Sequence, residues 1–182
     1  MKNWIHALVF CLFVPQALTQ ATPDPESTWL AYTEAMRVYD PPRMSLFMHP
    51  DALRQFRTTI DAALVGPQGA TAQAELLPLF AVRTLEEFQA LSDIDAFTRM
   101  YETVSKASPE LLELMSNARF EVVGTVHKEG VAYVTYTMSL LLDGRPVSSQ
   151  VVQTLKLHDG KWMLMLPASA GATVAKIEAR YR

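Results

Sequence analysis

The chain has 182 residues, with 16 basic and 19 acidic side chains and a net charge of −3. Mild acidity without a run of basic residues argues against nucleic acid or anionic lipid as the main partner. Cys11 is the only cysteine, which excludes a disulfide within the chain and a zinc site built from several cysteines.

The first 21 residues have the three parts of a secretory signal peptide. Lys2 supplies the positive charge, Trp4–Val14 is a short apolar run, and Thr19-Gln20-Ala21 places small residues at positions −3 and −1 of a cleavage site. A membrane-spanning helix needs about 20 apolar residues, so this run is too short for a typical anchor. We therefore expect export with cleavage after Ala21 and no stable membrane insertion afterwards. An uncleaved anchor is the alternative.

Residues 22–182 are expected to form a single domain of 161 residues that contains no cysteine and carries a net charge of −4. This length is sufficient to bury a hydrophobic core without disulfides. Helical patterns fill its first half. Asp24-Pro25 is typical of a helix start, and Asp40-Pro41-Pro42 ends that helix. The further expected helices are a short apolar one at Arg43–Met48, one from Pro50 to the Gly66–Gly69 turn, one opened by a capping box at Thr84–Glu87, one from Ser92, and one from Ser108 to Met115.

The residue period then changes from helical to alternating, which predicts strands. The expected strands are Arg119–His127, Val131–Leu142, Val147–His158 and Lys161–Leu166. Asp143-Gly144 and Asp159-Gly160 are hairpin signals, and three close turns between four strands imply an antiparallel meander. Ala168–Arg182 is expected to form a closing helix. The predicted fold class is therefore α+β, with N-terminal helices packed on a curved C-terminal sheet.

This arrangement resembles the nuclear-transport-factor-2-like (cystatin-like cone) superfamily, and in style its secreted bacterial members of unknown function. The resemblance rests on the first helix ending at Asp40-Pro41, on His49-Pro50-Asp51-Ala52-Leu53, and on the final Asp159-Gly160-Lys161-Trp162. It implies a curved sheet wrapped around helices and a conical pocket that some members use for binding or catalysis. The fold alone does not choose between these uses.

Alternation along the strands predicts which residues face the helices. The expected core-facing rows are Val134, Tyr136, Met138 and Leu140; Val151, Gln153, Leu155 and Leu157; and Trp162, Leu164 and Leu166. Tyr136 and Gln153 are the polar residues in these apolar rows. Together with Trp162, and with Tyr32 from an aromatic stripe on the first helix, they are the candidate ligand-binding residues. The alternative role for Tyr136 and Gln153 is hydrogen bonding within a filled core.

Catalytic motifs are missing from the sequence. It has no GxSxG, no GxGxxG and no phosphate-binding loop, and the three histidines of residues 22–182 are scattered, so we expect neither a metal site nor a cofactor. Acid–base chemistry would need a carboxylate or histidine on the pocket wall. The core-facing rows contain none, which leaves Asp40, His49 and Asp51 as the candidates. The simpler interpretation of His49-Pro50-Asp51 is a helix start.

The sequence therefore favours an exported, non-catalytic module that binds a small apolar ligand or a protein partner. The alternative is an acid–base enzyme of the isomerase, dehydratase or cyclase type. Met163 and Met165 should lie on the outer sheet face, which would suit a homodimer if no helix covers it. An open pocket holding an ionisable group would favour ligand binding or catalysis, whereas a filled pocket would favour a role in surface interaction.

Overall fold

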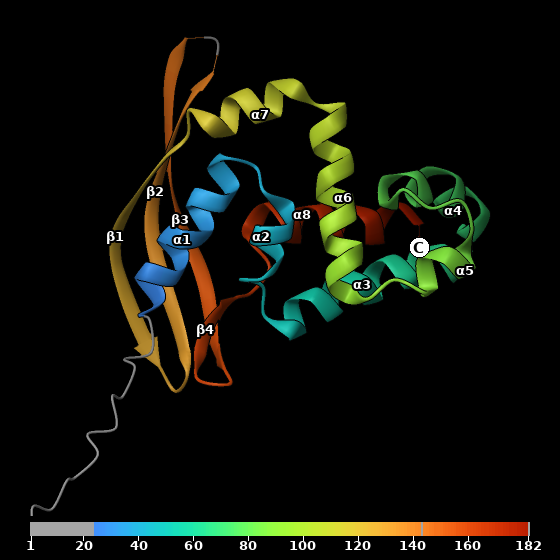
Figure 1. Ribbon diagram of the computed structural model, residues 1–182, viewed down its shortest axis with the longest axis horizontal. Coiled ribbons are helices and arrows are strands. Elements are labelled where there is room, and N and C mark those ends of the chain that lie inside the picture. Colours follow the sequence, from blue (N-terminus) through green and yellow to red (C-terminus); the bar gives the residue numbers. More distant parts are fainter. Residues whose placement is uncertain (1–23, 143, 182) are drawn as a thin grey trace, which may run out of the picture.

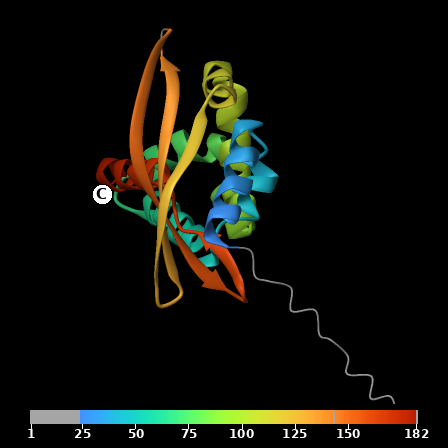
Figure 2. The same ribbon diagram turned by 90° about the vertical axis from the view of Figure 1, so that its left-hand side faces the viewer.

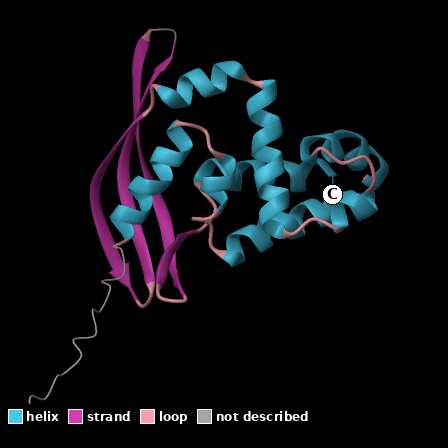
Figure 3. Ribbon diagram, in the orientation of Figure 1, coloured by secondary structure: helices cyan, strands magenta, loops and turns pink. Residues whose placement is uncertain are grey.

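The computed structural model describes residues 24–142 and 144–181. The signal-peptide prediction and its cleavage site lie outside the described residues, and so does Asp143. The α+β prediction is confirmed: helices, most of them N-terminal, pack on one face of a four-stranded antiparallel sheet, and a C-terminal helix follows it (Figures 1 and 3).

The first and third helices begin where the sequence predicts, and all three have a side-chain cap. Asp24 accepts a hydrogen bond from the Ser27 N–H at the start of α1 (Pro25–Arg37). Asp40 caps α2 (Pro41–Ser45), which starts earlier and ends earlier than expected because the two prolines fit a first helical turn. His49 caps α3 (Pro50–Val65).

The middle of the chain holds two elements that the sequence pattern did not predict, α4 (Gly69–Leu76) and the 3-10 helix η1 (Leu77–Phe80). The expected capping box at α5 (Leu85–Gln89) is shifted by one residue: Thr84 accepts from the Glu87 N–H, but the Glu87 carboxylate accepts from the N–H of Arg83. Ser92 caps α6 (Asp93–Ala107), and α7 (Pro109–Ser116) then leads to the sheet.

The sheet is the expected meander, with strand order β1-β2-β3-β4. The strands are β1 (Arg119–Lys128), β2 (Val131–Leu142), β3 (Arg145–His158) and β4 (Lys161–Leu164). A bulge lies in β1 between Val122 and Gly124. The closing helix is α8 (Ala168–Tyr181). Figure 2 looks onto the outer sheet face and shows the helices behind it, so no described element covers this face.

Pairing along the sheet confirms the predicted face of most core positions. Ala132, Val134, Leu155 and Leu164 are fully buried against the helices. Leu157, at the end of its row, differs from expectation because it is exposed. Trp162, which pairs with it, packs against the core on the predicted face but is only partly buried, because the helix cover ends there.

β4 is two residues shorter than expected because the chain leaves the ladder after Leu164. One further backbone hydrogen bond to β3 follows, from the Met165 N–H to the Thr154 carbonyl. Leu164 itself also exchanges backbone hydrogen bonds with the segment between α2 and α3. The Leu164 N–H donates to the Phe47 carbonyl at 2.8 Å, and the His49 N–H donates to the Leu164 carbonyl at 2.8 Å. This contact fixes the start of α3 against the sheet.

Candidate functional site

The four candidate ligand-binding residues do not form one pocket. Gln153 is buried, and its amide N–H donates to the carbonyls of Thr154 and Met165 at 2.9 and 2.8 Å. It therefore holds the chain that follows β4 against β3, which is the core role that the sequence analysis weighed as the alternative. Trp162 lies at the sheet margin, where the centroid of its ring is 5.7 Å from the centroid of the His127 ring. Neither residue faces Tyr32 and Tyr136.

Tyr32 and Tyr136 belong to a second group of residues, which we call the tyrosine cluster. Its members are Tyr32 on α1, Tyr39 after α1, Tyr101 on α6 and Tyr136 on β2. Trp29, one turn before Tyr32, packs against two of these rings: its ring centroid lies 4.3 Å from that of Tyr136 and 5.7 Å from that of Tyr32. The rings of Tyr39 and Tyr101 are 6.4 Å apart. Three separate parts of the chain thus bring tyrosines together.

The phenol groups of the cluster influence one another. Burial raises the pKa of Tyr32 well above its ordinary value, and the neighbouring phenols of Tyr101, Tyr136 and Tyr39 raise it further. Burial, with a smaller contribution from Tyr39, raises the pKa of Tyr101 to about 12. The pKa values of Tyr39 and Tyr136 are also raised by burial. All four phenols are therefore protonated at neutral pH and can donate hydrogen bonds.

The donors of this region have no acceptors within the described part of the chain. No hydrogen bond joins any of the four hydroxyl groups to another described residue, and the indole N–H of Trp29 is buried without a partner. Trp29, Tyr32 and Tyr136 are only 1%, 2% and 6% exposed. Buried polar groups in folded proteins nearly always have a partner, because an unpaired one costs about 1–3 kcal/mol. Among the described residues this cost applies to the Trp29 N–H, which is both fully buried and unpaired; the four hydroxyls are not fully buried and can bind water or a ligand oxygen.

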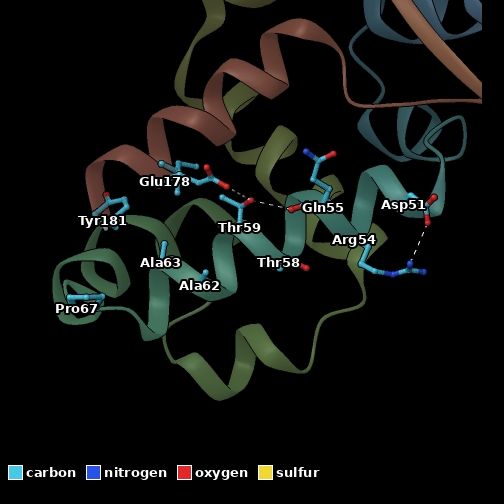
Figure 4. A pocket seen from close by; sticks show the side chains of 11 residues that line it. Asp51, Arg54, Gln55, Thr58, Thr59, Ala62, Ala63, Pro67, Glu178 and Tyr181 are labelled. Carbon is cyan, nitrogen blue, oxygen red and sulfur yellow. Dashed lines mark hydrogen bonds and ion pairs between the residues drawn. The ribbon is translucent and has the colours of Figure 1, made fainter.

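Two concave surfaces lie outside the sheet core. One, of about 490 Å³, lies between the end of α1, α6 and α7, and Tyr39 lines it together with Ser105 and Leu112. Tyr39 thus connects the tyrosine cluster with the surface. The other, of about 540 Å³, is a groove between α3 and α8 (Figure 4). Its floor contains Ala62 and Ala63, and its rim contains polar side chains such as Arg54 and Gln55.

The candidate catalytic residues lie at helix starts: Asp40 directly follows Tyr39 of the tyrosine cluster, whereas His49 and Asp51 lie at the start of α3. Asp40 accepts from the Arg43 N–H at 3.1 Å. The Nδ1 atom of His49 accepts from the Asp51 N–H at 3.1 Å, and the Asp51 carboxylate pairs with Arg54 at 3.3 Å. These contacts are structural caps, and none of the three residues appears among the groups that shift the pKa of Tyr32.

His49 is nevertheless an unusual cap because its ring is buried. It is 7% exposed, and its ring centroid lies 5.2 Å from that of His158 at the end of β3. Burial lowers the pKa of His49, the Asp51 carboxylate opposes this effect, and the cations of Lys156 and Arg54 add to it together with His158. The neutral ring with a free Nδ1 lone pair is therefore the form that caps α3. No group of three or more potential metal ligands occurs among the described residues.

Sequence reasoning missed half of the tyrosine cluster. Tyr39 has a left-handed backbone with φ of 50°, at the position after α1 where glycine is usual. A tyrosine there costs conformational energy, which is the local signal that its ring has a role. Tyr101 follows helical spacing from Phe97, and the sequence favoured core packing over ligand contact for this aromatic pair. The unpaired Trp29 N–H has no sequence signal, since it depends on what packs around it.

Comparisons with known proteins give no identification. No family model matches the chain, and neither a curated protein nor a solved structure matches it. None of the helices in the described residues is long and apolar enough to cross a membrane. The site must therefore be interpreted from its own geometry.

Proposed function

We propose that this chain is an exported, non-catalytic binding protein that holds a small, uncharged and mostly apolar molecule at the tyrosine cluster. The observation that carries the proposal is the convergence of four phenol hydroxyls near a buried indole N–H, all without acceptors among the described residues. A ligand with a carbonyl or ether oxygen would satisfy several of these donors at once.

The surroundings of the cluster define the chemistry of the ligand. The Trp29 and Tyr136 rings pack against Phe120, and the Tyr32 ring packs against Phe47, so the walls are aromatic. Every group that shifts the pKa of Tyr32 is another phenol, and no cation is among them. Arg37, which lines the concave surface beside Tyr39, is already paired with Glu34 at 3.0 Å, so an uncharged acceptor is favoured over a carboxylate or phosphate.

The same observations favour binding over acid–base catalysis. A general base must be deprotonated near neutral pH, whereas the pKa values of the four tyrosines are raised above their ordinary value, so the phenols keep their protons. The isomerase, dehydratase or cyclase alternative would need a carboxylate or histidine at this position. Asp40, His49 and Asp51 are instead engaged as helix caps or beside them.

We also propose the relationship to the nuclear-transport-factor-2-like superfamily, on two grounds. The order of elements fits it, with helices first and a curved meander last. The tyrosine cluster lies between α1, α6 and the inner face of β2, which is where the resemblance implies a conical pocket. The rings of Trp29, Tyr32 and Tyr136 pack together in the core, whereas Tyr39 lines a concave surface, so a ligand would enter from the side of Tyr39.

A homodimer through the outer sheet face is a second part of the proposal. This face is uncovered, and it exposes the apolar side chains of Val126, Tyr133 and Val152. Sedimentation equilibrium of Tyr133→Lys against the unchanged protein tests this contact.

Binding of the neutral, carbonyl-bearing dye Nile red tests the ligand proposal. Fluorescence titration should give saturable binding, and Tyr32→Phe and Tyr101→Phe should each weaken it about two- to tenfold, the range expected for one hydrogen bond. Tyr133→Phe is the matched control because it removes the same hydroxyl from the outer sheet face. Equal affinity in all four proteins would contradict the proposal, as would absence of saturable binding.

A further inference from the structure

The two long edges of the sheet differ in how they are protected. β4 pairs only with Leu155–His158, so the preceding nine residues of β3, Arg145–Gln153, have no partner strand on the side away from β2 in the described chain. Where this free edge meets the paired part of β3, the Thr154 carbonyl accepts from the Met165 N–H and the Gln153 side chain donates to the Met165 carbonyl. From there to the hairpin tip, the backbone groups of β3 that point away from β2 have no strand to bind in the described chain.

The free edge lacks the features that usually prevent strands from associating. Pro146 is at its tip, but Val147–Gln153 contains no charge, no proline and no glycine. The pairing of β2 with β3 runs without a bulge from Val131↔Lys156 to Leu142↔Arg145. Residues 145–150 are all exposed, with Val147 at 45%. The hairpin of β2 and β3 also projects beyond α7, so the edge is accessible (Figure 1).

The opposite edge has these protective features. β1 carries Arg119, Glu121 and Lys128, and its bulge at Val122/Gly124 interrupts the regular ladder. In addition, the Thr125 hydroxyl on β1 donates to the Glu26 carboxylate of α1 at 2.7 Å. Natural sheets use such charges and bulges against edge pairing. These features are present on the β1 edge and absent from the β3 edge, so the β3 edge is open to pairing with another strand.

We propose that a second copy of this chain pairs antiparallel with the β3 edge. An extended strand is the partner that satisfies a row of free backbone donors and acceptors. Any antiparallel register within Pro146–Gln153 brings no like charges opposite each other, since this segment is uncharged. Each chain offers one such edge, so a two-fold axis closes the assembly as a dimer. This contact uses backbone atoms of the edge and is independent of the outer sheet face and of the ligand.

The test compares charges placed on the edge with a charge placed on the face. Val147→Lys/Ser149→Lys places two ammonium groups on the exposed edge, where they would oppose their copies. Tyr133→Lys is the matched face variant. Because the proposed face contact would also associate copies, the edge is tested in the Tyr133→Lys background: in sedimentation equilibrium we expect Tyr133→Lys to dimerise and the triple variant Tyr133→Lys/Val147→Lys/Ser149→Lys to dissociate at least about tenfold more readily. Thermal melting of each variant checks that it is folded.

Amide hydrogen exchange provides a readout that side-chain contacts would not give. In the dimer, alternate amides of Val147–Val152 should exchange more slowly than in dilute monomer, while the β1 edge should not change with concentration. The proposal is overturned if Tyr133→Lys stays monomeric at about millimolar concentration, or if the triple variant dimerises as tightly as Tyr133→Lys. It is equally overturned if slower exchange is confined to residues of the outer face.

Discussion

Two parts of the β2–β3 pair have the same ladder but different surroundings. In the covered part, Ala132–Tyr136 with Val151–Leu155, the inner side chains contact α1 and the aromatic core, and Leu155 is fully buried. In the projecting hairpin, Leu140–Leu142 with Arg145–Val147, β1 no longer pairs and the helices end, so Leu142 and Val147 are exposed. Alternation decides which face a side chain takes, whereas the reach of the helices decides whether that face is buried.

The largest difference is expected between two leucines on these two parts. Leu155→Ala leaves a cavity in the covered part and should lower the free energy of unfolding by about 2–5 kcal/mol. Leu142→Ala makes the same chemical change on the projecting hairpin and should stay within about 0.5 kcal/mol. Urea denaturation of both variants measures this. Equal losses would mean that the hairpin is covered in solution, as it would be in an assembly.

The next effect concerns the polar residue inside the covered part. Gln153→Ala removes the donor that binds the Met165 carbonyl and leaves that acceptor without its side-chain partner. We expect a loss of about 1–3 kcal/mol in the free energy of unfolding. Gln150→Ala, at an exposed position of the same strand, should change it by less than about 0.5 kcal/mol. If Gln153→Ala left the free energy of unfolding unchanged, the segment after β4 would not need this contact.

Trp162 marks the lower end of the covered part and should have an intermediate effect. Truncating a fully buried aromatic side chain costs about 3–5 kcal/mol, but the half-buried Trp162 gives up less contact, so Trp162→Ala should cost about 1–2 kcal/mol. Chemical denaturation beside Trp29→Ala, which removes a fully buried ring, measures the difference. Equal costs for the two tryptophans would place the margin of the core beyond Trp162.

These comparisons also indicate what sequence reasoning can reach. Capping residues such as Asp24 and Ser92 act locally, so the helix starts were predictable. Alternation placed Tyr136 and Gln153 on the inner face, but Gln153 proved to be a tether because its acceptor, Met165, leaves the ladder early. The proximity of Tyr101 to Tyr32 depends on how α6 packs on α2, which in turn packs on α1, and no local pattern encodes this. α4 was missed because its alanine-rich sequence lacks a clear apolar face.

The smallest effect is expected at the junction between α3 and the sheet, and it depends on pH. Burial holds the pKa of His49 below its ordinary value of 6.5 in the folded state. The unfolded chain therefore binds a proton more readily, so the stability that neutral His49 contributes is present above about pH 6.5 and is lost as the pH falls through the folded-state pKa. Protonation of Nδ1 also removes the acceptor that caps α3, and a cap is worth about 1 kcal/mol.

His49→Asn keeps a capping side chain that does not titrate. Denaturation between pH 8 and 5 should thus show a steeper fall for the unchanged protein than for His49→Asn, by about 1 kcal/mol. The surrounding charges set the size of this difference: Asp51 favours the protonated ring, while Lys156, Arg54 and a charged His158 oppose it. Parallel pH profiles for the two proteins would show that the cap survives protonation, with Asp51 compensating the lost acceptor.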